Sequence, residues 1–431
     1  MSIDDQQSPS APGWRVALGL SALAFVSMLS YALARPSIES LFLEVHGQEG
    51  LPAAWLLVAG LIVPVIMIYV RLVSTVDLLR LYLWTALVSA ALFAAITPAC
   101  QASVPGAHFA LYAVKEIYVV VLIEVFYSFA NAVFPIQRAR WFYGLFGGVG
   151  AVGGIIGNLG VGPLASALGT GNVPWLLPPL LLLLAGLALL VARGHPLSPP
   201  PVERPATLRD AGRVVGASSY LLAVTLLIVV TQLVITFVDF SYNGIMKEAF
   251  PDTDLRAGMI GRVYAGVAVC TFTLHTLTGP VLRAISVPGA LLAIPLLLSA
   301  GLGVFVLVPG LATVLVVKVA SKAFDYTIFK SAKEILYIPL SYAEKTQGKS
   351  IVDMLSYRVA KGAASLLLLG LIATSASSLV PLLTLALMAV WIGLTVVIAR
   401  RFRGLVSRAQ EMTASDAPGE NKTDARVEEE R

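Results

Sequence analysis

The sequence predicts an all-α protein that crosses a lipid bilayer with twelve helices. Hydrophobic residues fill 57% of its 431 positions and charged residues only 13%. Apolar stretches of about 20 residues, the length that crosses the hydrocarbon core of a bilayer, recur along the whole chain. A soluble domain usually contains about 25% charged residues. The composition therefore excludes a soluble enzyme, a disordered protein and a nucleic-acid-binding module.

Two sets of six apolar segments account for the twelve predicted helices. The first set covers residues 14–43, 51–73, 80–101, 107–135, 140–168 and 174–193. The second set covers residues 217–245, 256–279, 287–308, 310–337, 350–376 and 378–400. The stretch between the sets is rich in proline and charge and is too polar to cross a membrane. We therefore expect an N-terminal six-helix bundle (1–193), a cytoplasmic linker (194–216), a C-terminal six-helix bundle (217–400) and a disordered cytoplasmic tail (401–431).

Two six-helix pseudo-repeats joined by a linker are the layout of the major facilitator-type fold. The basic residues indicate the orientation, because Lys and Arg gather in the loops on one side of the predicted bundle. The opposite loops carry little beyond Lys247 and Arg256. Because cytoplasmic loops are enriched in Lys and Arg, both termini and the linker are expected in the cytoplasm. The sequence thus predicts an integral, multi-pass protein of the bacterial inner membrane.

Charged residues inside the predicted helices are the candidate functional residues, because an ionisable group in a bilayer is costly unless it faces water or a partner. Several recur at helical spacing, such as Lys318, Lys322 and Asp325. The basic candidates for substrate binding are Arg35, Lys115, Lys318, Lys322, Arg358 and Lys361. The acidic candidates, for coupling or for ion pairing, are Glu39, Glu116, Glu124, Asp239 and Asp325. Ser27 and Tyr31 share the helix side of Arg35.

The positive excess among these residues predicts an anionic substrate. Phosphate groups suit Arg forks and Lys point charges, so a phosphorylated substrate is expected in a water-filled cavity. The alternative is structural pairing between helices, for example Lys318 with Glu124 or Arg358 with Asp325. Aromatic residues on the same helices are candidates for stacking on a base or for ordinary packing: Tyr112, Tyr118, Tyr127, Phe324 and Tyr326.

A glycine-rich run in the fifth predicted helix contains the pattern G-x-G-x-x-G at Gly148, Gly150 and Gly153. No strand–turn–helix pattern surrounds it, so a dinucleotide-binding fingerprint is not expected. The run also contains small residues four apart, at 144 and 148, 150 and 154, and 153 and 157. Such spacing lets another membrane helix approach closely. The sequence therefore predicts a helix-packing surface here.

Two longer stretches resemble the TLC-type ATP/ADP translocases of bacteria and plastids. The first is Arg140-Trp141-Phe142-Tyr143-Gly144-Leu145-Phe146-Gly147. The second begins at Phe329-Lys330-Ser331-Ala332-Lys333-Glu334 and continues through Tyr337-Ile338-Pro339-Leu340, Lys345-Thr346-Gln347-Gly348-Lys349, Asp353, Arg358 and Lys361-Gly362. The charged end of the first helix, from Arg35 to Leu41 with Glu39, is a weaker match, with Pro36-Ser37-Ile38 where the family has a second basic residue.

The resemblance implies exchange of ADP for ATP, or proton-linked nucleotide uptake. It implies that charged residues within the helices carry the function, and the matching positions are Arg35, Glu39, Lys115, Glu124, Lys318, Lys322, Arg358 and Lys361. Such a protein acts on a small anionic substrate, with a nucleotide as the first candidate.

We therefore expect a secondary active transporter that works by alternating access and acts as a monomer. The alternative is a transporter of the same fold for a non-nucleotide organic anion or another metabolite. A receptor or scaffold is a further alternative, which the buried charges disfavour. Enzyme activity is not expected, because the H-E-x-x-H, G-x-S-x-G and Walker patterns are absent from the sequence. Neither a cofactor nor a metal is expected.

Overall fold

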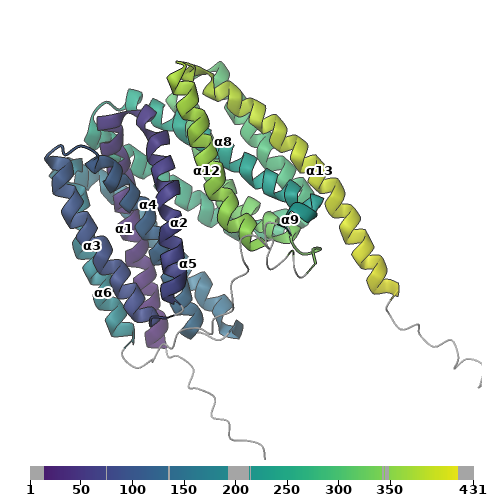
Figure 1. Ribbon diagram of the computed structural model, residues 1–431, viewed down its shortest axis with the longest axis horizontal. Helices are drawn as coiled ribbons and strands as arrows, with labels where there is room; N and C mark the ends of the chain where they lie inside the picture. The colour runs from purple at the N-terminus through teal and green to yellow at the C-terminus, as the bar shows by residue number, and fades with distance from the viewer. Residues whose placement is uncertain are drawn as a thin grey trace, which may run out of the picture.

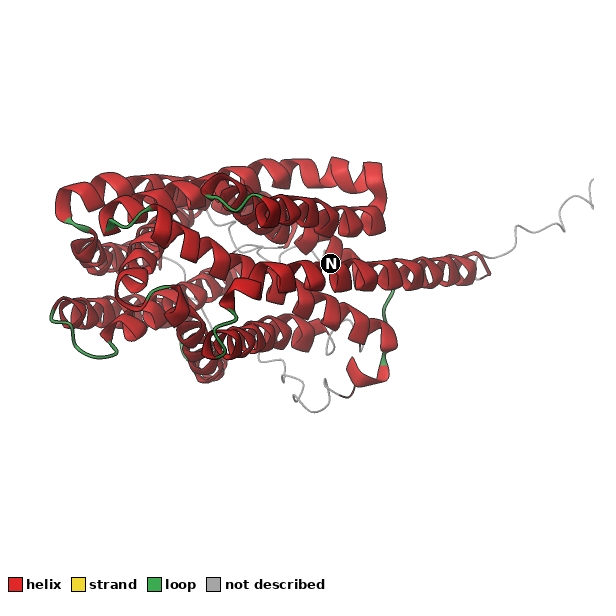
Figure 2. Ribbon diagram, turned by 90° about the horizontal axis from the view of Figure 1, so that it is seen from above, coloured by secondary structure: helices red, strands yellow, loops and turns green. Residues whose placement is uncertain are grey.

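The computed structural model describes residues 14–73, 75–133, 136–192, 213, 215–341, 344 and 349–415. The regular structure of these residues is helical throughout, as the two perpendicular views show (Figures 1 and 2). Most of the predicted linker (194–216) and the end of the predicted tail lie outside the described residues, and so do the side chains of Arg140, Trp141 and Asp353.

The first half of the chain forms six helices, which agree closely with the predicted segments. They are α1 (Trp14–His46), α2 (Leu51–Val73), α3 (Leu78–Gln101), α4 (Ala107–Val133), α5 (Ile136–Leu168) and α6 (Leu177–Ala192). The short helices η1 (Gln48–Gly50) and η2 (Thr170–Leu176) lie between α1 and α2 and between α5 and α6.

The second half differs more from the prediction. Its helices are α8 (Ser219–Ala249), α9 (Thr253–Leu307), α10 (Leu311–Phe324), α11 (Lys330–Leu336), α12 (Lys349–Ala373) and α13 (Val380–Ser415). The range of α9 contains two predicted segments, 256–279 and 287–308, and the helix is broken between them at Ser286, with φ 60° and ψ 164°. The predicted tenth segment is divided, because a π-helix, η3 (Asp325–Phe329), separates α10 from α11.

The prediction of a disordered tail from residue 401 onward is wrong for its first part. Helix α13 continues to Ser415. The guanidinium of Arg401 donates to the carbonyl oxygen of Ser219 at 2.7 Å, and Phe402 and Leu405 pack against the hydrophobic core. These contacts with the second half stabilise the added turns.

Nine helices in the described residues are long and apolar enough to cross a membrane. The 55-residue α9 counts once among them, and α4 and the 14-residue α10 are not included. The structure thus confirms a helical, multi-pass membrane protein. The number of twelve spans stays a prediction.

Three helices begin at polar residues that cap their free backbone N–H groups, as helix starts favour. Asp77 accepts from the backbone N–H of Leu79 at 2.8 Å at the start of α3. Ser218 and Asp252 do the same for α8 and α9. These caps fix where each helix enters the bundle.

The two halves of the chain lie side by side, with α1–α6 on the left of Figure 1 and α8–α13 on the right. They meet through two helix pairs, α5 with α9 and α2 with α12. Helix α1 also contacts α9, while most of its surface packs on α4, α5 and α6. The α5–α9 pair matters most for function, because the cavity described below lies along it.

Glycines set the spacing of α5 against its neighbours. A Cβ atom on Gly153 would collide with the carbonyl oxygen of Phe25 in α1, and one on Gly157 would lie 2.8 Å from the carbonyl oxygen of Leu29. Helices α1 and α5 therefore run in parallel with their backbones in contact. Close packing is confirmed for this part of the glycine run.

Two further glycines join α5 to α9 across the halves. A Cβ atom on Gly258 would lie 3.0 Å from the Cα of Gly162, and one on Gly261 would collide with the carbonyl oxygen of Asn158. The residue numbers rise along α5 as they fall along α9, so the two helices are antiparallel. Their closest approach is at the end of the bundle that carries η1 and η2, which we call the η1 end.

The prediction of close packing is wrong for Gly144, Gly148 and Gly154. A Cβ atom on any of these residues would have no neighbour within 4 Å, and the same holds for Gly147. The reason is that α9 diverges from α5 along the part of α5 that precedes residue 158. The glycine run therefore has two different surfaces. One surface is packed, and the other faces open space.

The packed surface gives a direct test of the fold. Substitution Gly153→Ala should lower the free energy of unfolding by about 1–3 kcal/mol, the usual cost of overpacking, because the Phe25 carbonyl cannot retreat easily. The matched substitution Gly186→Ala on α6, where nothing lies within 4 Å, should leave stability unchanged or slightly higher. Thermal unfolding of the purified variants in detergent measures both. Equal melting temperatures would contradict the contact.

Candidate functional site

A cavity of about 800 Å³ lies between the two halves. Helices α1, α4 and α5 form one wall, and α9 with Tyr326 of η3 forms the other. The lining residues of α5 do not extend past Asn158, and those of α9 begin at Tyr264. The cavity therefore occupies the half of the bundle where α1 begins, opposite the η1 end. It is open there, since the lining residues Phe272, Tyr127 and Tyr326 are 55%, 41% and 41% exposed.

The η1 end is closed by polar contacts around Arg256, which is fully buried in the first turn of α9. Its guanidinium forms an ion pair of 2.7 Å with Glu44 of α1. It also donates to the hydroxyl and the carbonyl oxygen of Ser40, and to the carbonyl oxygens of Phe250 and Pro251. Arg256 thus ties the end of α1 to the start of α9 and seals the cavity from this side.

A second contact across the halves lies beside Arg256. The carboxylate of Asp254 accepts from the backbone N–H of Thr170 at 2.7 Å and from its hydroxyl at 2.6 Å. Thr170 begins η2 in the first half. Together these contacts form a gate, which we define as Glu44, Asp254, Arg256 and Thr170.

The first half contributes a buried chain of charges at the inner end of the cavity. The Nε of Arg35 lies 3.3 Å from Oε1 of Glu39, one turn further along α1. The same carboxylate lies 3.6 Å from Nζ of Lys115 on α4, and Lys115 lies 3.0 Å from Glu116. The Lys115 side chain is completely buried and lies 3.7 Å from the ring centre of Tyr112. Sequence placed these residues on two helices, and the fold brings them into one chain.

The second half contributes a triad on α8 and α10. The carboxylate of Asp239 accepts from Nζ of Lys318 at 2.7 Å and lies 3.1 Å from Nζ of Lys322. The two lysines are one helical turn apart, so each faces one oxygen of the same carboxylate. Burial of such charges is tolerated only when partners and hydrogen bonds compensate the lost hydration. Asp239 is the partner of both lysines, so one negative charge is shared between two positive charges.

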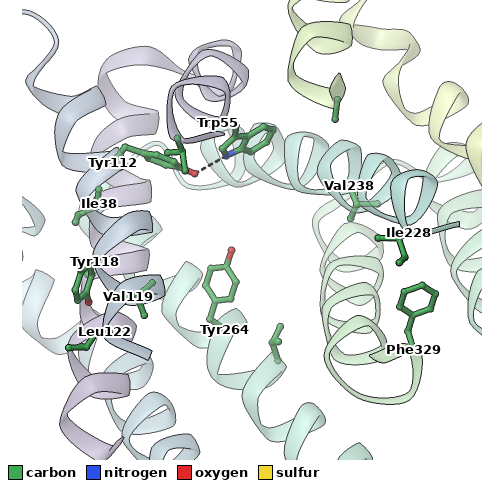
Figure 3. Close-up of a cluster of buried hydrophobic side chains, with 14 of the residues drawn as sticks. Ile38, Trp55, Tyr112, Tyr118, Val119, Leu122, Ile228, Val238, Tyr264 and Phe329 are labelled. Atoms are coloured by element: carbon green, nitrogen blue, oxygen red, sulfur yellow. Dashed lines mark hydrogen bonds between the residues drawn. The ribbon is translucent and has the colours of Figure 1, made fainter. Parts of the chain in front are cut away.

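The ring of Tyr264 lies between these two groups of charges. The guanidinium carbon of Arg35 is 3.8 Å from its ring centre, and Nζ of Lys318 is 5.2 Å from it. Both distances fall within the range of cation–π attraction. Figure 3 shows the ring between helices of the first half, which carry Ile38 and Tyr118, and the helices of the second half, which carry Val238 and Phe329. Tyr264 therefore connects the basic groups of the two halves.

The remaining predicted residues are less tightly held. Lys361 of α12 lies 5.6 Å from the ring centre of Trp55 on α2. Arg358 is half-buried and Glu124 is exposed. Within the described residues, neither Arg358 nor Lys361 has a carboxylate within 4 Å. Among the six predicted basic candidates, Arg358 and Lys361 are the two without a direct acidic partner in the described residues.

Asp325 begins the π-helix η3, and its Oδ1 is buried without a hydrogen-bond partner. Nε2 of Gln232 on α8 is likewise buried and unpartnered. The suggested pairs of Arg358 with Asp325 and of Lys318 with Glu124 are both wrong. Lys318 forms its ion pair with Asp239, and within the described residues no ion pair joins Arg358 to Asp325. The sequence did not reveal the π-helix in which Asp325 lies.

Of the eleven predicted charged residues, Arg35 is the one that lines the cavity within the described part of the chain. Ser27 and Tyr31 line it as well, which confirms the predicted polar side of α1. The other ten belong to the groups of charges around its inner end, or to the helices beside it.

Two of the five predicted aromatic candidates, Tyr127 and Tyr326, line the cavity. Tyr112 instead accepts a hydrogen bond from the indole of Trp55 at 2.8 Å (Figure 3). Tyr118 packs edge-on against Phe93. Packing is therefore the role of Tyr112 and Tyr118.

Three residues of the site were not predicted. Arg256 was read as a loop charge, although Asp252 marks a helix start four residues earlier and makes Arg256 part of α9. Tyr264 is an aromatic residue in an apolar run of α9, and no sequence pattern distinguished it from a packing residue. Asn158 is 8% exposed within the glycine run and lines the cavity, with its Oδ1 unpartnered. A lone Asn in an apolar helix was the signal available for it.

The C-terminal half matches the family model described as TLC ATP/ADP transporter, over residues 306–402. Among curated proteins, the chain is 27% identical to ADP,ATP carrier protein 1 of Chlamydia muridarum over 375 residues, which are 74% of this chain and 70% of that protein. It is also 27% identical to ADP,ATP carrier protein 1 of Chlamydia trachomatis, over 65% of this chain and 62% of that protein. The chain thus spans about two thirds of the length of these relatives.

Solved transporters share the fold at low sequence identity. The nucleoside transporter NupG (D323A mutant) superposes with a TM-score of 0.67 at 11% identity, over 90% of this chain and 99% of that one. A bacterial homologue of the iron transporter ferroportin superposes with a TM-score of 0.69 at 11% identity, over 89% and 98%. These neighbours show that the chain shares their helical transporter fold. The family model and the curated carriers confirm the predicted resemblance: the chain is similar to the TLC ATP/ADP transporters.

Proposed function

We propose that the chain is a secondary active transporter that exchanges phosphorylated anions, with nucleotides as the first candidate, across the bacterial inner membrane. The observation that carries the proposal is the position of Arg35, at the inner end of an open cavity and in contact with Tyr264. The names of the curated relatives, which are ADP,ATP carriers, support the choice of nucleotides. The protein acts as a monomer, and it transports its substrate without changing it chemically.

The charges around Arg35 favour an anionic substrate. Arg35, Lys115, Lys318 and Lys322 share three carboxylates, those of Glu39, Glu116 and Asp239. One positive charge is thus left over within these pairs, and Lys361 adds another without a direct acidic partner. Phosphate oxygens are the strongest hydrogen-bond acceptors for such groups. A phosphate at Arg35 would compete with Glu39 for the guanidinium and supply the missing negative charge.

This competition offers a route to exchange. Without substrate, Asp239 pairs with Lys318 and Lys322 inside the second half, while the contact of Arg35 with Tyr264 crosses the halves and stabilises one arrangement of them. A bound anion takes over part of these contacts and frees the halves to move about the site. An empty transporter then moves less readily than a loaded one, which is the requirement for antiport. Glu124, Asp239 and Asp325 are the candidates for any coupled proton.

Alternating access requires that the gate at the η1 end opens when the open end closes. The described state is open where α1 begins and closed at Arg256. Arg71, Arg80 and Arg283 lie at the ends of helices on the open side, which favours the cytoplasm as the compartment that the cavity faces. The cytoplasmic position of both termini follows from the same orientation.

The main test of the proposal is the substitution Lys322→Ala. Removal of one partner from a buried hydrogen-bonded charge pair typically costs about 2–5 kcal/mol of binding free energy, so binding and uptake of ADP should fall roughly thirtyfold or more. The measurements are exchange of labelled ADP in proteoliposomes and ADP binding to the purified protein. A competition panel of nucleotides, sugar phosphates and organic acids identifies the substrate class.

The control is Arg403→Ala, an exposed position near the end of α13, which should leave ADP exchange at the wild-type level. If Lys322→Ala exchanges ADP at the wild-type rate, Lys322 does not belong to the binding site. Competition by sugar phosphates or organic acids, with none by nucleotides, would replace the nucleotide by another anion and leave the transport mechanism in place.

The gate makes a separate prediction. The substitution Arg256→Gln removes the ion pair with Glu44 and the contacts to Ser40, so the η1 end should open more often. Amide hydrogen exchange of residues 38–46 and 250–258 should then accelerate about tenfold, which corresponds to about 1.4 kcal/mol. Arg262→Gln, an exposed position on the same helix, is the control. Equal exchange in the two variants would show that Arg256 does not hold the gate.

A further inference from the structure

A second hollow of the molecule is an apolar groove between α2 and α3, with a volume of about 540 Å³. Both helices pack on α4 but hardly on each other, so α4 forms the floor of the groove. Among the described residues, the groove shares no lining residue with the central cavity. It therefore lies on the outer surface of the first half, where a membrane protein meets lipid.

The groove is about as long as one leaflet of a bilayer is thick. Its lining residues recur three or four apart, from Leu61 to Leu72 on α2 and from Leu81 to Leu92 on α3. Each stretch covers about 11 residues, or about 17 Å at the rise of an α-helix. Half of the hydrocarbon core of a bilayer is about 15 Å thick. The groove thus has the length of one phospholipid acyl chain that extends from the membrane surface to the midplane.

The walls of the groove are chemically suited to a hydrocarbon chain. Polar side chains in the walls bond within the protein: the hydroxyl of Thr85 donates to the carbonyl oxygen of Leu81 at 2.8 Å, and that of Tyr69 lies 3.0 Å from the hydroxyl of Ser128. Large apolar side chains of the groove are at least half exposed, namely Ile68, Trp84 and Val88. Such a groove offers a polar ligand little, whereas an acyl chain covers its exposed apolar surface.

Arginines continue both walls at the end where α2 ends and α3 begins. Arg71 follows Ile68 by three residues, and Arg80 precedes Trp84 by four, so each arginine shares a helix face with a groove residue. Both arginines are exposed. They lie about one helical turn beyond the apolar stretch, at the level where a lipid whose chain fills the groove carries its headgroup.

The charges at this mouth favour an anionic headgroup. Asp77 is the acid between the two arginines in the sequence, and its carboxylate caps the start of α3. Within the described residues, Arg80 has no carboxylate within 4 Å. Glu116 and Glu124, the acids of α4, do not line the groove. The mouth therefore carries a positive excess, and phosphate oxygens are strong hydrogen-bond acceptors for a guanidinium.

We infer that the groove between α2 and α3 binds one anionic phospholipid, of the cytoplasmic leaflet in the orientation proposed above. One acyl chain lies on α4 between the two helices, and the phosphate lies at Arg71 and Arg80. Trp84, one turn inside Arg80, contacts the start of the chain, at the depth where membrane proteins favour Trp. Because α2 also packs on α12 of the second half, the lipid supports one of the helix pairs that join the halves.

The test compares phosphatidylglycerol with phosphatidylcholine that carries the same acyl chains. Native mass spectrometry of the full-length purified protein measures how much of each lipid stays bound at equal concentration. A basic residue near an anionic headgroup typically contributes roughly fivefold in affinity, so two arginines should give the wild type a preference of at least about tenfold for phosphatidylglycerol. Arg80→Gln should reduce this preference about fivefold. Arg283→Gln, an exposed arginine outside the groove, is the matched control and should keep the wild-type preference.

A second variant blocks the acyl chain. Val88→Trp places an indole in the groove and should reduce retention of both lipids about tenfold or more, because each CH₂ group that loses its contact costs roughly fourfold in affinity. Val390→Trp, at an exposed position of α13 outside the groove, is the control and should retain lipid as the wild type does. Glycerophosphoglycerol, the headgroup without acyl chains, should not displace the bound lipid at the same concentration.

Each contrary result overturns the inference and leaves the proposed transport function untouched. Equal retention of the two lipids by the wild type, or the same preference in Arg80→Gln and Arg283→Gln, would show that the mouth does not select an anionic headgroup. Equal retention in Val88→Trp and Val390→Trp would place the acyl chain elsewhere. Displacement by glycerophosphoglycerol would show a headgroup site that does not use the groove. A wild-type dimer that Val88→Trp dissociates would make the groove a contact between two copies of the chain.

Discussion

The burial of like charges in a membrane protein is the constraint on which the rest of this structure depends. Lys318 and Lys322 share the single carboxylate of Asp239, and Lys115 lies fully buried between Glu39 and Glu116. Charges removed from water need partners with good geometry, and one carboxylate between two lysines leaves them under-compensated. The proposed anionic substrate would balance this excess of positive charge. The same pairs hold the helices of each half in place while the anion is absent.

The proposed movement of the halves and the stability of their contact depend on different parts of the interface between them. At the η1 end the backbones of α5 and α9 touch at Gly258 and Gly261, and Arg256 adds ionic and hydrogen-bonded contacts. At the opposite end the same two helices diverge around the cavity. Polar contacts can exchange with water when a gate opens, whereas a large apolar contact would have to expose its surface. Contacts of the kind made by Arg256 thus suit an interface that opens and closes, as the proposed alternating access requires.

The cavity joins these two parts. Tyr264, labelled in Figure 3, stands at its inner end, where its ring contacts both Arg35 of the first half and Lys318 of the second half. In the proposed transport mechanism, a ligand that displaces Arg35 would also remove one of the two cations from this ring. The glycine run of α5 has a related double role, because its packed side holds α1 while its open side forms the cavity floor.

Sequence by itself determined the membrane environment, most helix boundaries and the identity of the charged residues, because hydropathy and the cost of buried charge are properties of single segments. Gly153 was correctly expected in a close helix contact for the same reason. The tertiary structure alone decided which charges pair. Lys318 pairs with Asp239 and not with Glu124, and Arg256, expected in a loop, lies at the centre of the gate. It also left Gly148 facing open space. Pairing and spacing depend on how helices far apart in the chain approach each other, and no local pattern records that distance.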